Sequence, residues 1–379
     1  MNSNKEYLAM FEHLITEQLE RAERLKEGTG FTDYAAAEKI VIGIIPGDGI
    51  GPVIMTEAVK VLSKLLADEI ASGRIELRPI EGLTLENRVA KGETVPEDVL
   101  AAIKECDVLL KGPTTTPDKN SGLPNLESAN VTLRKELDLF ANVRPVAIPE
   151  LGIDWTFYRE NTEGEYSLGS RGIVISDDLS VDFKVTTTAG TERIARAAFE
   201  FAKANGKTRV SIVTKANIMK KTDGKFLDLC YRVAGDYPDI KADDWYVDIM
   251  AANLVNPDIR ADFQVFVLPN LYGDIITDEA AQIQGGVGTA GSANVGARYA
   301  MFEAIHGSAP RMVADGIADK ANPASIMKAA VMLLRHIGMT EKADALDSAV
   351  NTAAGALNMS GTASGNSACE FSELVLRNL

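Results

Sequence analysis

Apolar residues along the chain form short continuous runs, which alternate with longer segments in which they recur at helical spacing. The run at 39–45 (KIVIGII) is rich in Ile and Val and ends at Pro-Gly-Asp-Gly, which predicts a buried parallel strand followed by a turn. The same reasoning predicts strands at 75–80, 108–110, 208–214, 242–249 and 263–269, and helices at 53–71, 96–104, 130–137, 190–204, 222–235 and 324–337. This alternation is typical of an α/β fold with a largely parallel sheet.

The N-terminal segment precedes this alternation. Residues 5–27 predict an amphipathic helix that ends at Gly28-Thr29-Gly30. Its apolar positions near helical spacing are Leu8, Phe11, Ile15, Leu19 and Leu25. We expect residues 1–38 to form an N-terminal helical extension. The chain shows no internal repeat and no Gly/Ser linker, so any two lobes must be joined by short crossings.

Composition narrows the function classes. The 379 residues suggest two or three domains, or one large two-lobed unit. The 54 acidic residues exceed the 39 Lys and Arg, giving a net charge of -15, which argues against nucleic acid and membrane surfaces as partners. The charge does not exclude an anionic small molecule, since a local site can be basic when the whole chain is acidic. No apolar run reaches the ~18 residues that a membrane span needs.

Three cysteines and three histidines constrain the chemistry further. Cys106, Cys230 and Cys369 are far apart and odd in number, which predicts a reduced, cytoplasmic protein without a disulfide framework. The start of the chain has no secretory signal pattern. With so few His and Cys, we expect any metal to be bound by oxygen ligands.

A group of basic and small polar residues predicts an anion site. Ser128, Asn130 and Arg134 fall near the N-terminal end of the helix predicted at 130–137, where free backbone N–H groups favour an anion. Arg144 and Arg159 add guanidinium groups suited to carboxylates. For any single Arg, ordinary surface charge is the alternative.

Two further positions are candidates for metal and acid–base chemistry. Asp274 and Asp278 are four residues apart, hence on one face if helical, where their repulsion is relieved if Mg²⁺ or Mn²⁺ lies between them. The alternative is an Asp-rich helix start stabilised by the helix dipole. Lys215 follows the strand predicted at 208–214, the end at which α/β sheets place their sites. It could act as an acid or base, or simply be a solvated lysine.

Glycine-rich segments do not predict a Rossmann fold. The stretch 286–291 (GVGTAG) matches G-x-G-x-x-G, but it follows a helix-like segment instead of a strand. The stretch 47–51 (GDGIG) follows a strand but lacks the spacing and a Walker lysine. The small-residue loops at 306–310 (HGSAP) and 322–323 (NP) suit close approach of the backbone to a ligand.

Five blocks together resemble the β-decarboxylating dehydrogenases, a family that includes isocitrate, isopropylmalate, homoisocitrate and tartrate dehydrogenases. The blocks are 45–51 (IPGDGIG), 140–145 (FANVRP), 159–164 (RENTEG), 270–278 (NLYGDIITD) and 306–310 (HGSAP). The resemblance covers about residues 39–379. It implies that family's two-lobed fold, with a large cofactor-binding domain from 39–140 plus 284–379 and a small domain from 141–283 that carries a dimer-forming segment.

The resemblance also implies a reaction, in which a 2-hydroxy acid is oxidised by NAD or NADP and loses its β-carboxylate as carbon dioxide. Arg134, Arg144 and Arg159 would bind the substrate carboxylates. Tyr166 would protonate the enol, and Lys215 would deprotonate the alcohol. Asp248, Asp274 and Asp278 would hold Mg²⁺ or Mn²⁺. In the family a Lys and one Asp come from the other subunit, which implies a homodimer whose sites are shared through Lys215 and Asp248. The positions implied in cofactor binding are Thr116, Asn217, His306, Gly307, Ser308, Ala309, Arg311 and Asn322.

Substrate and cofactor preference rest on short segments. Isocitrate-specific members resemble the Ser128-x-Asn130-x-x-x-Arg134 pattern, whose polar groups suit a third carboxylate better than an alkyl tail. We therefore expect isocitrate, a tricarboxylate, with isopropylmalate, homoisocitrate or tartrate as alternatives. The loop at 118–127 is longer than in familiar members. Arg311 suits the 2′-phosphate of NADP, so we expect NADP as the cofactor, with NAD as the alternative. A non-catalytic regulatory subunit is a further alternative, which the retained Tyr166, Lys215 and Asp residues disfavour.

Overall fold

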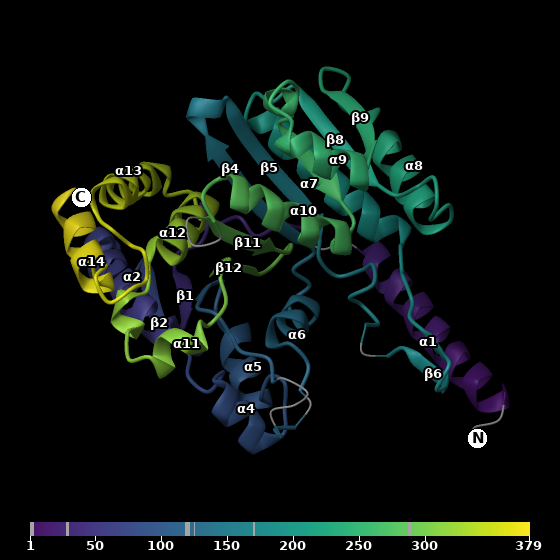
Figure 1. The fold of residues 1–379 in the computed structure, drawn as a ribbon, viewed down its shortest axis with the longest axis horizontal. Coiled ribbons are helices and arrows are strands. Elements are labelled where there is room, and N and C mark those ends of the chain that lie inside the picture. Colours follow the sequence, from purple (N-terminus) through teal and green to yellow (C-terminus); the bar gives the residue numbers. More distant parts are fainter. Residues whose placement is uncertain (1–3, 28–29, 118–121, 125, 170, 287–289) are drawn as a thin grey trace. The chain divides into compact units, whose positions relative to one another are not determined.

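The structure is a computed structural model that describes residues 4–27, 30–117, 122–124, 126–169, 171–286 and 290–379. Two segments singled out above, the loop at 118–127 and the glycine stretch at 286–291, lie partly outside the described residues. The chain forms two compact units (Figure 1). Unit 1 comprises Met1–Gly30 and Phe140–Ile283, and unit 2 comprises Phe31–Leu139 and Gln284–Leu379.

Unit 2 contains five strands of the largely parallel sheet. Their order is β2 (Ile75–Pro79), β1 (Ile40–Ile45), β3 (Val108–Lys111), β12 (Ala300–Ala304) and β11 (Gly291–Val295). Only the pairing of β11 with β12 is antiparallel among the pairings described in this unit. The helices are α2 (Gly51–Leu65), α3 (Ala67–Ala71), α4 (Leu85–Lys91), α5 (Glu97–Lys104), α6 (Ala129–Glu136), α11 (Pro310–Ala314), α12 (Ala324–His336), α13 (Thr340–Ala356) and α14 (Ala368–Arg377). Helix α12 packs on β11, β12 and β3, while α14 packs on α2 and α13.

Unit 1 contains the other five strands. Their order is β4 (Ala141–Ile148), β5 (Ile153–Glu160), β10 (Val265–Leu268), β8 (Arg209–Thr214) and β9 (Lys241–Tyr246). The β4–β5 pair is an antiparallel hairpin, and the other described pairings here are parallel. The helices are α1 (Asn4–Arg24), α7 (Thr188–Ala204), α8 (Thr222–Ala234), α9 (Val247–Val255) and α10 (Asn270–Ile283). A separate antiparallel ribbon is formed by β6 (Ile173–Ser176) and β7 (Leu179–Val181).

Aromatic side chains form the core of unit 1. Phe157 on β5 and Phe266 on β10 stack with ring centroids 4.4 Å apart, and Trp155 meets both of them edge-on. All three are fully buried. Strand β10 is buried along its whole length and has the continuous apolar sequence VFVL, as expected for a strand covered on both faces. The alternation of such strands with helices confirms the predicted α/β class.

Two of the predicted elements have different limits in the structure. The helix expected at 53–71 is divided at Leu66, a fully buried residue that departs from helical geometry with φ −104° and ψ 19°. The strand expected at 242–249 ends at Tyr246, and α9 begins at Val247. The α9 sequence VDIMAANLV has Ala, Leu and Met in its interior, which favour a helix. Asp248 therefore lies in the first turn of a helix, not in a strand.

The glycine turn after β1 fits tightly against a second loop of unit 2. Gly49 has a φ of +61°, and Ile50 N donates to Ser308 O over 3.0 Å. A Cβ atom at Gly49 would lie 2.0 Å from that same Ser308 oxygen, which no real contact tolerates. Gly49 is therefore required both for its backbone conformation and for the approach of the 306–309 loop.

We predict that Gly49→Ala destabilises the protein more than Gly73→Ala. Gly73 also has a positive φ, +76°, but a Cβ atom added there would have nothing within 4 Å, so only backbone strain of ~1–2 kcal/mol is expected. Gly49→Ala should cost a further ~1–3 kcal/mol because Ser308 must move. Urea unfolding of both variants measures this difference. Equal losses of stability in the two variants would show that the close approach of the 306–309 loop does not restrict the side chain at position 49.

Candidate active site

Helix α10 presents two carboxylates to two arginines of the neighbouring strands. Asp274 and Asp278 are one turn apart, as the sequence predicts. Arg144 on β4 donates from Nη1 to Asp278 Oδ1 over 2.8 Å and to Thr277 Oγ1 over 2.7 Å. Arg159 on β5 donates from Nη1 to Asp274 Oδ1 over 2.5 Å. The arginines offset the like-charge repulsion that two carboxylates on one helix face would otherwise suffer.

Tyr166 completes this cluster. Its hydroxyl donates to Asp274 Oδ2 over 2.5 Å, and the guanidinium of Arg159 lies 5.3 Å from the centre of its ring. Arg159, only 1% exposed, also donates from Nε and Nη2 to the carbonyl and side-chain oxygens of Asn270, at 2.9 and 2.7 Å. One carboxylate oxygen of Asp274 thus faces a cation and the other faces a phenol.

A glycine within the 270–278 block makes room for Arg159. A Cβ atom at Gly273 would lie 2.4 Å from Arg159 Cγ. Any side chain at position 273 would therefore displace the arginine stem. The glycine between Tyr272 and Asp274 is thus explained by the packing of Arg159.

Lys215 and Asp248 form a second pair. Lys215 directly follows β8, and its Nζ lies 2.5 Å from Asp248 Oδ1 in the first turn of α9. The hydrogen bond from Lys215 lowers the pKa of Asp248 below its ordinary value. The backbone N–H of Lys215 donates to Asp223 Oδ2 over 2.8 Å. Asn217, two residues on, is exposed.

Lys184 is a buried cation that the sequence reasoning missed. Its Nζ lies 2.5 Å from Asp223 Oδ1, 3.2 Å from Glu165 Oε1 and 4.4 Å from the ring centre of Tyr272. Burial disfavours its charge, but the hydrogen bond and charge of Asp223 outweigh burial and raise the pKa of Lys184. It therefore connects the segments that carry Tyr166, Lys215 and Asp274. No spacing or motif marks it in the sequence.

In unit 2, Arg134 on α6 meets a buried carboxylate. Its Nη2 lies 3.3 Å from Glu303 Oε1 on β12, and Lys111 Nζ on β3 lies 3.3 Å from Glu303 Oε2. Asn294 Nδ2 donates to Glu303 Oε1 over 2.8 Å. Burial opposes the charge of Glu303, but Lys111 and Arg134 outweigh it and hold the pKa at about 2. Glu303 and Lys111 were not predicted as site residues: Lys111 directly follows the apolar run at 108–110, and Glu303 lies in a segment for which no element was predicted.

The loop after β3 connects the predicted substrate helix with the 306–309 loop. Thr114 Oγ1 donates to Asn130 Oδ1 on α6 over 3.1 Å, and Thr115 Oγ1 lies 2.7 Å from Ser308 Oγ. Thr116 follows on the exposed side. Ser128 occupies the N-cap position of α6, but its side chain makes no capping hydrogen bond. These contacts bring the predicted residues of unit 2 into one neighbourhood.

The 306–309 loop is itself unusual. His306 Nδ1 lies 3.0 Å from Gly307 O, while Nε2 is buried and has no hydrogen-bond partner within the described part of the chain. Burial lowers the pKa of His306. Ala309 has a φ of 45°, a conformation that non-glycine residues rarely adopt. A buried, unpartnered imidazole nitrogen beside a strained backbone fits a loop that meets a bound cofactor.

Two more predicted cofactor positions flank this loop. Ile305 N donates to Ser325 Oγ over 3.2 Å, which ties the 322–325 turn to the residue before His306. In that turn Asn322 Oδ1 accepts from Ala324 N over 2.9 Å. Arg311, in α11, is exposed.

The predicted metal ligands gather only in part. Among the described residues, no three His, Cys, Asp or Glu side chains converge closely enough to hold a metal ion. Asp274 and Asp278 lie one helical turn apart, while Asp248 is paired with Lys215. Mg²⁺ typically takes one or two protein carboxylates together with substrate oxygens and water, so the α10 pair fits such an ion.

The sequence matches the isocitrate/isopropylmalate dehydrogenase family over residues 41–363. It is 38% identical to the homoisocitrate dehydrogenase of Methanocaldococcus jannaschii over 323 residues, which are 81% of this chain and 88% of that protein. It is 40% identical to the NADP isocitrate dehydrogenase of Rickettsia prowazekii over 322 residues, which are 81% of this chain and 62% of that protein.

The fold of the chain also matches a solved structure of an isocitrate dehydrogenase. The crystal structure of isocitrate dehydrogenase from Methylococcus capsulatus matches with a TM-score of 0.78 at 34% identity, covering 89% of this chain and 99% of that one. The chain therefore belongs to the isocitrate/isopropylmalate dehydrogenase family. The family's fold, with its large, mostly parallel sheet, is confirmed. None of the described helices is long and apolar enough to cross a membrane.

We predict that Glu303→Gln destabilises the protein by ~3–5 kcal/mol at pH 7, because Lys111 is left as a buried cation without its counter-charge. The pKa of Glu303 falls from an ordinary 4.5 to about 2 on folding, so its contribution is present above pH 4.5 and lost toward pH 2. The gap between wild type and variant should therefore narrow as the pH falls, as measured by urea unfolding. As a control, Glu105→Gln, on a side chain that is 73% exposed, should change stability by less than ~0.5 kcal/mol. A gap that is constant with pH would contradict the assignment.

Proposed function

We propose that this protein is a metal-dependent isocitrate dehydrogenase, which oxidises and decarboxylates isocitrate to 2-oxoglutarate with reduction of NADP or NAD. The observation that carries the proposal is the cluster in which Arg144, Arg159 and Tyr166 surround the carboxylates of Asp274 and Asp278. It combines cations for an anionic substrate, a phenolic proton donor and oxygen ligands for a hard metal ion.

Each side chain has a defined task in this proposal. Arg134, Arg144 and Arg159 bind substrate carboxylates through guanidinium forks. Lys215 takes the proton of the substrate hydroxyl, and Tyr166 later returns a proton to the enol carbon. Asp274 holds the Tyr166 phenol in place.

Asp274 and Asp278, together with Asp248 of a second copy, would hold Mg²⁺ or Mn²⁺. The ion supplies Lewis-acid stabilisation of the oxygen that gains negative charge. Because Asp248 and Lys215 pair with each other, both would be delivered together by one subunit of a homodimer. This assembly would explain why three carboxylates do not converge within the described residues of a single chain.

The polar start of α6 favours isocitrate over isopropylmalate. The Ser128 hydroxyl is not used for capping, and Asn130 reaches Thr114 through its oxygen, which leaves the Asn130 amide nitrogen for a ligand. Both groups can hydrogen-bond a third carboxylate, whereas an isopropyl tail would leave them unpaired. The similarity to homoisocitrate dehydrogenase makes homoisocitrate the second candidate substrate.

NADP is the proposed cofactor, with NAD as the alternative. The exposed Arg311 is positioned next to the 306–309 loop in sequence and can pair with a 2′-phosphate, but it cannot accept a hydrogen bond from a ribose hydroxyl. Thr116, His306, Gly307, Ser308, Ala309 and Asn322 would contact the same cofactor, with Asn217 from the second subunit. A cytoplasmic location is proposed from the cysteines, which are free thiols in the structure.

We predict that isocitrate gives the highest kcat/KM in a matrix of 2-hydroxy acids, cofactors and divalent metals, as followed by reduced nicotinamide absorbance. Isocitrate should exceed isopropylmalate by at least about 10²-fold, because unpaired polar groups penalise the alkyl substrate. Replacing Ser128 with Ala and Asn130 with Leu should narrow this ratio. Glu136→Gln, on the exposed side of the same helix, should leave it unchanged.

Two results would overturn the proposal. A higher kcat/KM for homoisocitrate than for isocitrate would identify homoisocitrate as the substrate. Absence of turnover with every acid and cofactor, in a folded protein, would support a non-catalytic regulatory subunit instead.

We further predict that inactive Lys215→Ala and inactive Arg134→Ala chains, mixed under subunit exchange, recover about a quarter of wild-type activity, because half of the dimers then hold one intact site. Mixing Lys215→Ala with Asp248→Ala is the matched control. It should recover nothing, since both lesions affect residues that one chain donates to its partner. Equal recovery in the two mixtures, or none in either despite exchange, would contradict the shared site.

A further inference from the structure

Helix α1 lies outside the part of the chain that matches the family, which begins at residue 41. Its amphipathic pattern alone indicates no role. In the structure it belongs to unit 1, and it contacts the segment that carries Tyr166 at two places. These contacts point to a role in positioning the site.

The first contact is polar. Arg21 in the last turn of α1 donates from Nη1 to Glu163 Oε1 over 2.8 Å and from Nη2 to Thr162 Oγ1 over 3.2 Å. Glu163 is only 3% exposed, so this guanidinium meets a carboxylate that water hardly reaches. Thr162 and Glu163 precede Tyr166 by four and three residues.

The site of this contact holds two buried carboxylates. Glu160, 2% exposed, accepts from the backbone N–H groups of Thr162 and Glu163 at 2.8 and 2.6 Å. Burial and the charge of Glu163 raise the pKa of Glu160 to about 7. Two negative charges this close repel each other where water is excluded. The positive charge of Arg21 next to Glu163 therefore stabilises the turn. Arg193 of α7 lies at the same turn, where its Nη2 donates to Thr162 Oγ1 over 3.0 Å.

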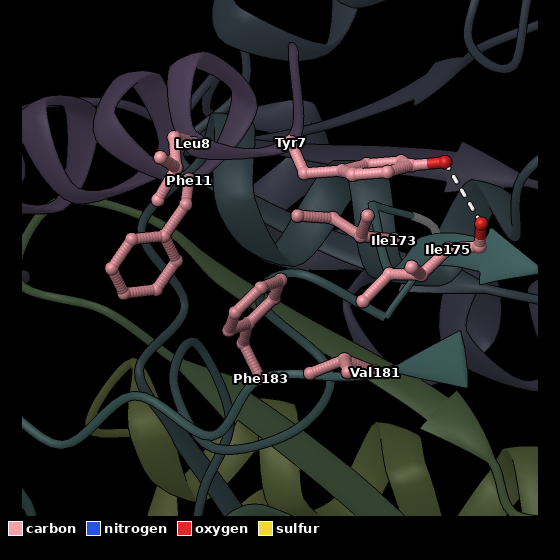
Figure 2. A pocket seen from close by; sticks show the side chains of 7 residues that line it. All are labelled: Tyr7, Leu8, Phe11, Ile173, Ile175, Val181 and Phe183. Carbon is pink, nitrogen blue, oxygen red and sulfur yellow. Dashed lines mark hydrogen bonds between the residues drawn. The ribbon is translucent and has the colours of Figure 1, made fainter. Parts of the chain in front are cut away.

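The second contact is apolar and lies on the other side of Tyr166. Leu14 of α1 is buried in a cluster with Leu168 and Ile173. Figure 2 shows the neighbouring part of this contact, where Tyr7, Leu8 and Phe11 of α1 line a pocket together with Ile173, Ile175, Val181 and Phe183. Tyr7 OH donates to Ile175 O over 2.8 Å, and the rings of Phe11 and Phe183 lie 5.8 Å apart.

The two contacts bracket Tyr166 in sequence. Arg21 holds residues 162–163 and Leu14 holds Leu168, so α1 spans the turn from which the phenol reaches Asp274. Because α1 contacts the chain on both sides of Tyr166, it limits the positions that this side chain can take. We propose that α1 is a positioning element for the active site, which holds the Tyr166 hydroxyl on Asp274 through Arg21 and Leu14. This inference rests on the proposed role of Tyr166 as the proton donor.

The test replaces Arg21 by Met in the full chain. Arg21→Met should lower kcat about tenfold with little change in KM, because a displaced donor affects the chemical step more than binding. Arg21→Lys should restore part of the loss, since it returns a cation to Glu163. Arg24→Met is the matched control on the same helix; Arg24 is exposed, and its replacement should leave kcat unchanged.

A cycle with Tyr166→Phe separates positioning from general destabilisation. If α1 acts through Tyr166, Arg21→Met should cause no further loss in the Tyr166→Phe background. An equal loss in both backgrounds, or the same loss for Arg24→Met, would overturn the proposal.

Hydrogen exchange provides a readout that does not depend on the reaction. Arg21→Met, but not Arg24→Met, should speed exchange in peptides covering residues 161–169. If the wild type turns over no substrate, the proposed function fails, yet faster exchange in these peptides would still support the positioning role. Unchanged exchange together with unchanged kcat would overturn it.

Discussion

The carboxylate of Asp274, held between the guanidinium of Arg159 and the phenol of Tyr166, is the interaction on which the rest of the candidate site depends. Arg159 is buried where Gly273 leaves space for its stem, and Asn270 accepts hydrogen bonds from its Nε and Nη2. The same helix turn then presents Asp278 to Arg144. One helix start thus brings together two guanidinium groups, a phenol and two carboxylates.

Both units contain buried pairs of opposite charges. Lys184 with Asp223 in unit 1 and Glu303 with Lys111 in unit 2 are pairs that water barely reaches. Such pairs cost desolvation energy, and apolar replacements are often as stable, so stability alone does not explain them. We suggest that they fix the geometry of the strands and turns carrying the functional side chains. The chain can therefore be strongly acidic overall and still concentrate cations where an anionic substrate would bind.

The sequence predicted those parts of the fold that local patterns determine. The apolar run of β1, the helix carrying Asp274 and Asp278, and the position of Lys215 after β8 were all confirmed, since each follows from periodicity over a few residues. Strands β4, β5, β11 and β12 of the main sheet were missed. Strand β4 contains Pro145 and has the polar residues Asn142 and Arg144 among its apolar ones, and β11 is built largely from Gly, Ser, Ala and Asn, so neither shows a clear strand pattern.

Long-range pairing explains the remaining omissions. The partners of Arg144 and Lys111 are 134 and 192 residues away in sequence, so no local pattern reveals that these side chains are buried against a carboxylate. Lys184 and Glu303 have no motif at all, and only the folded chain shows their role. Asp248 was found by resemblance, but its place in a helix was not, because the strand-favouring residues Trp245, Tyr246 and Val247 lead into it without a turn signal.

The central claim, that the α10 carboxylates form an oxygen site for a hard metal ion, is tested most directly by Mn²⁺ titration observed by electron paramagnetic resonance. Wild type and Asp258→Asn, a variant of an exposed carboxylate, are expected to bind Mn²⁺ with equal affinity. Asp278→Asn should bind it at least about tenfold more weakly, since even the loss of an outer partner of a metal ligand has an effect of that size. Unchanged Mn²⁺ affinity in a folded Asp278→Asn protein would contradict the account.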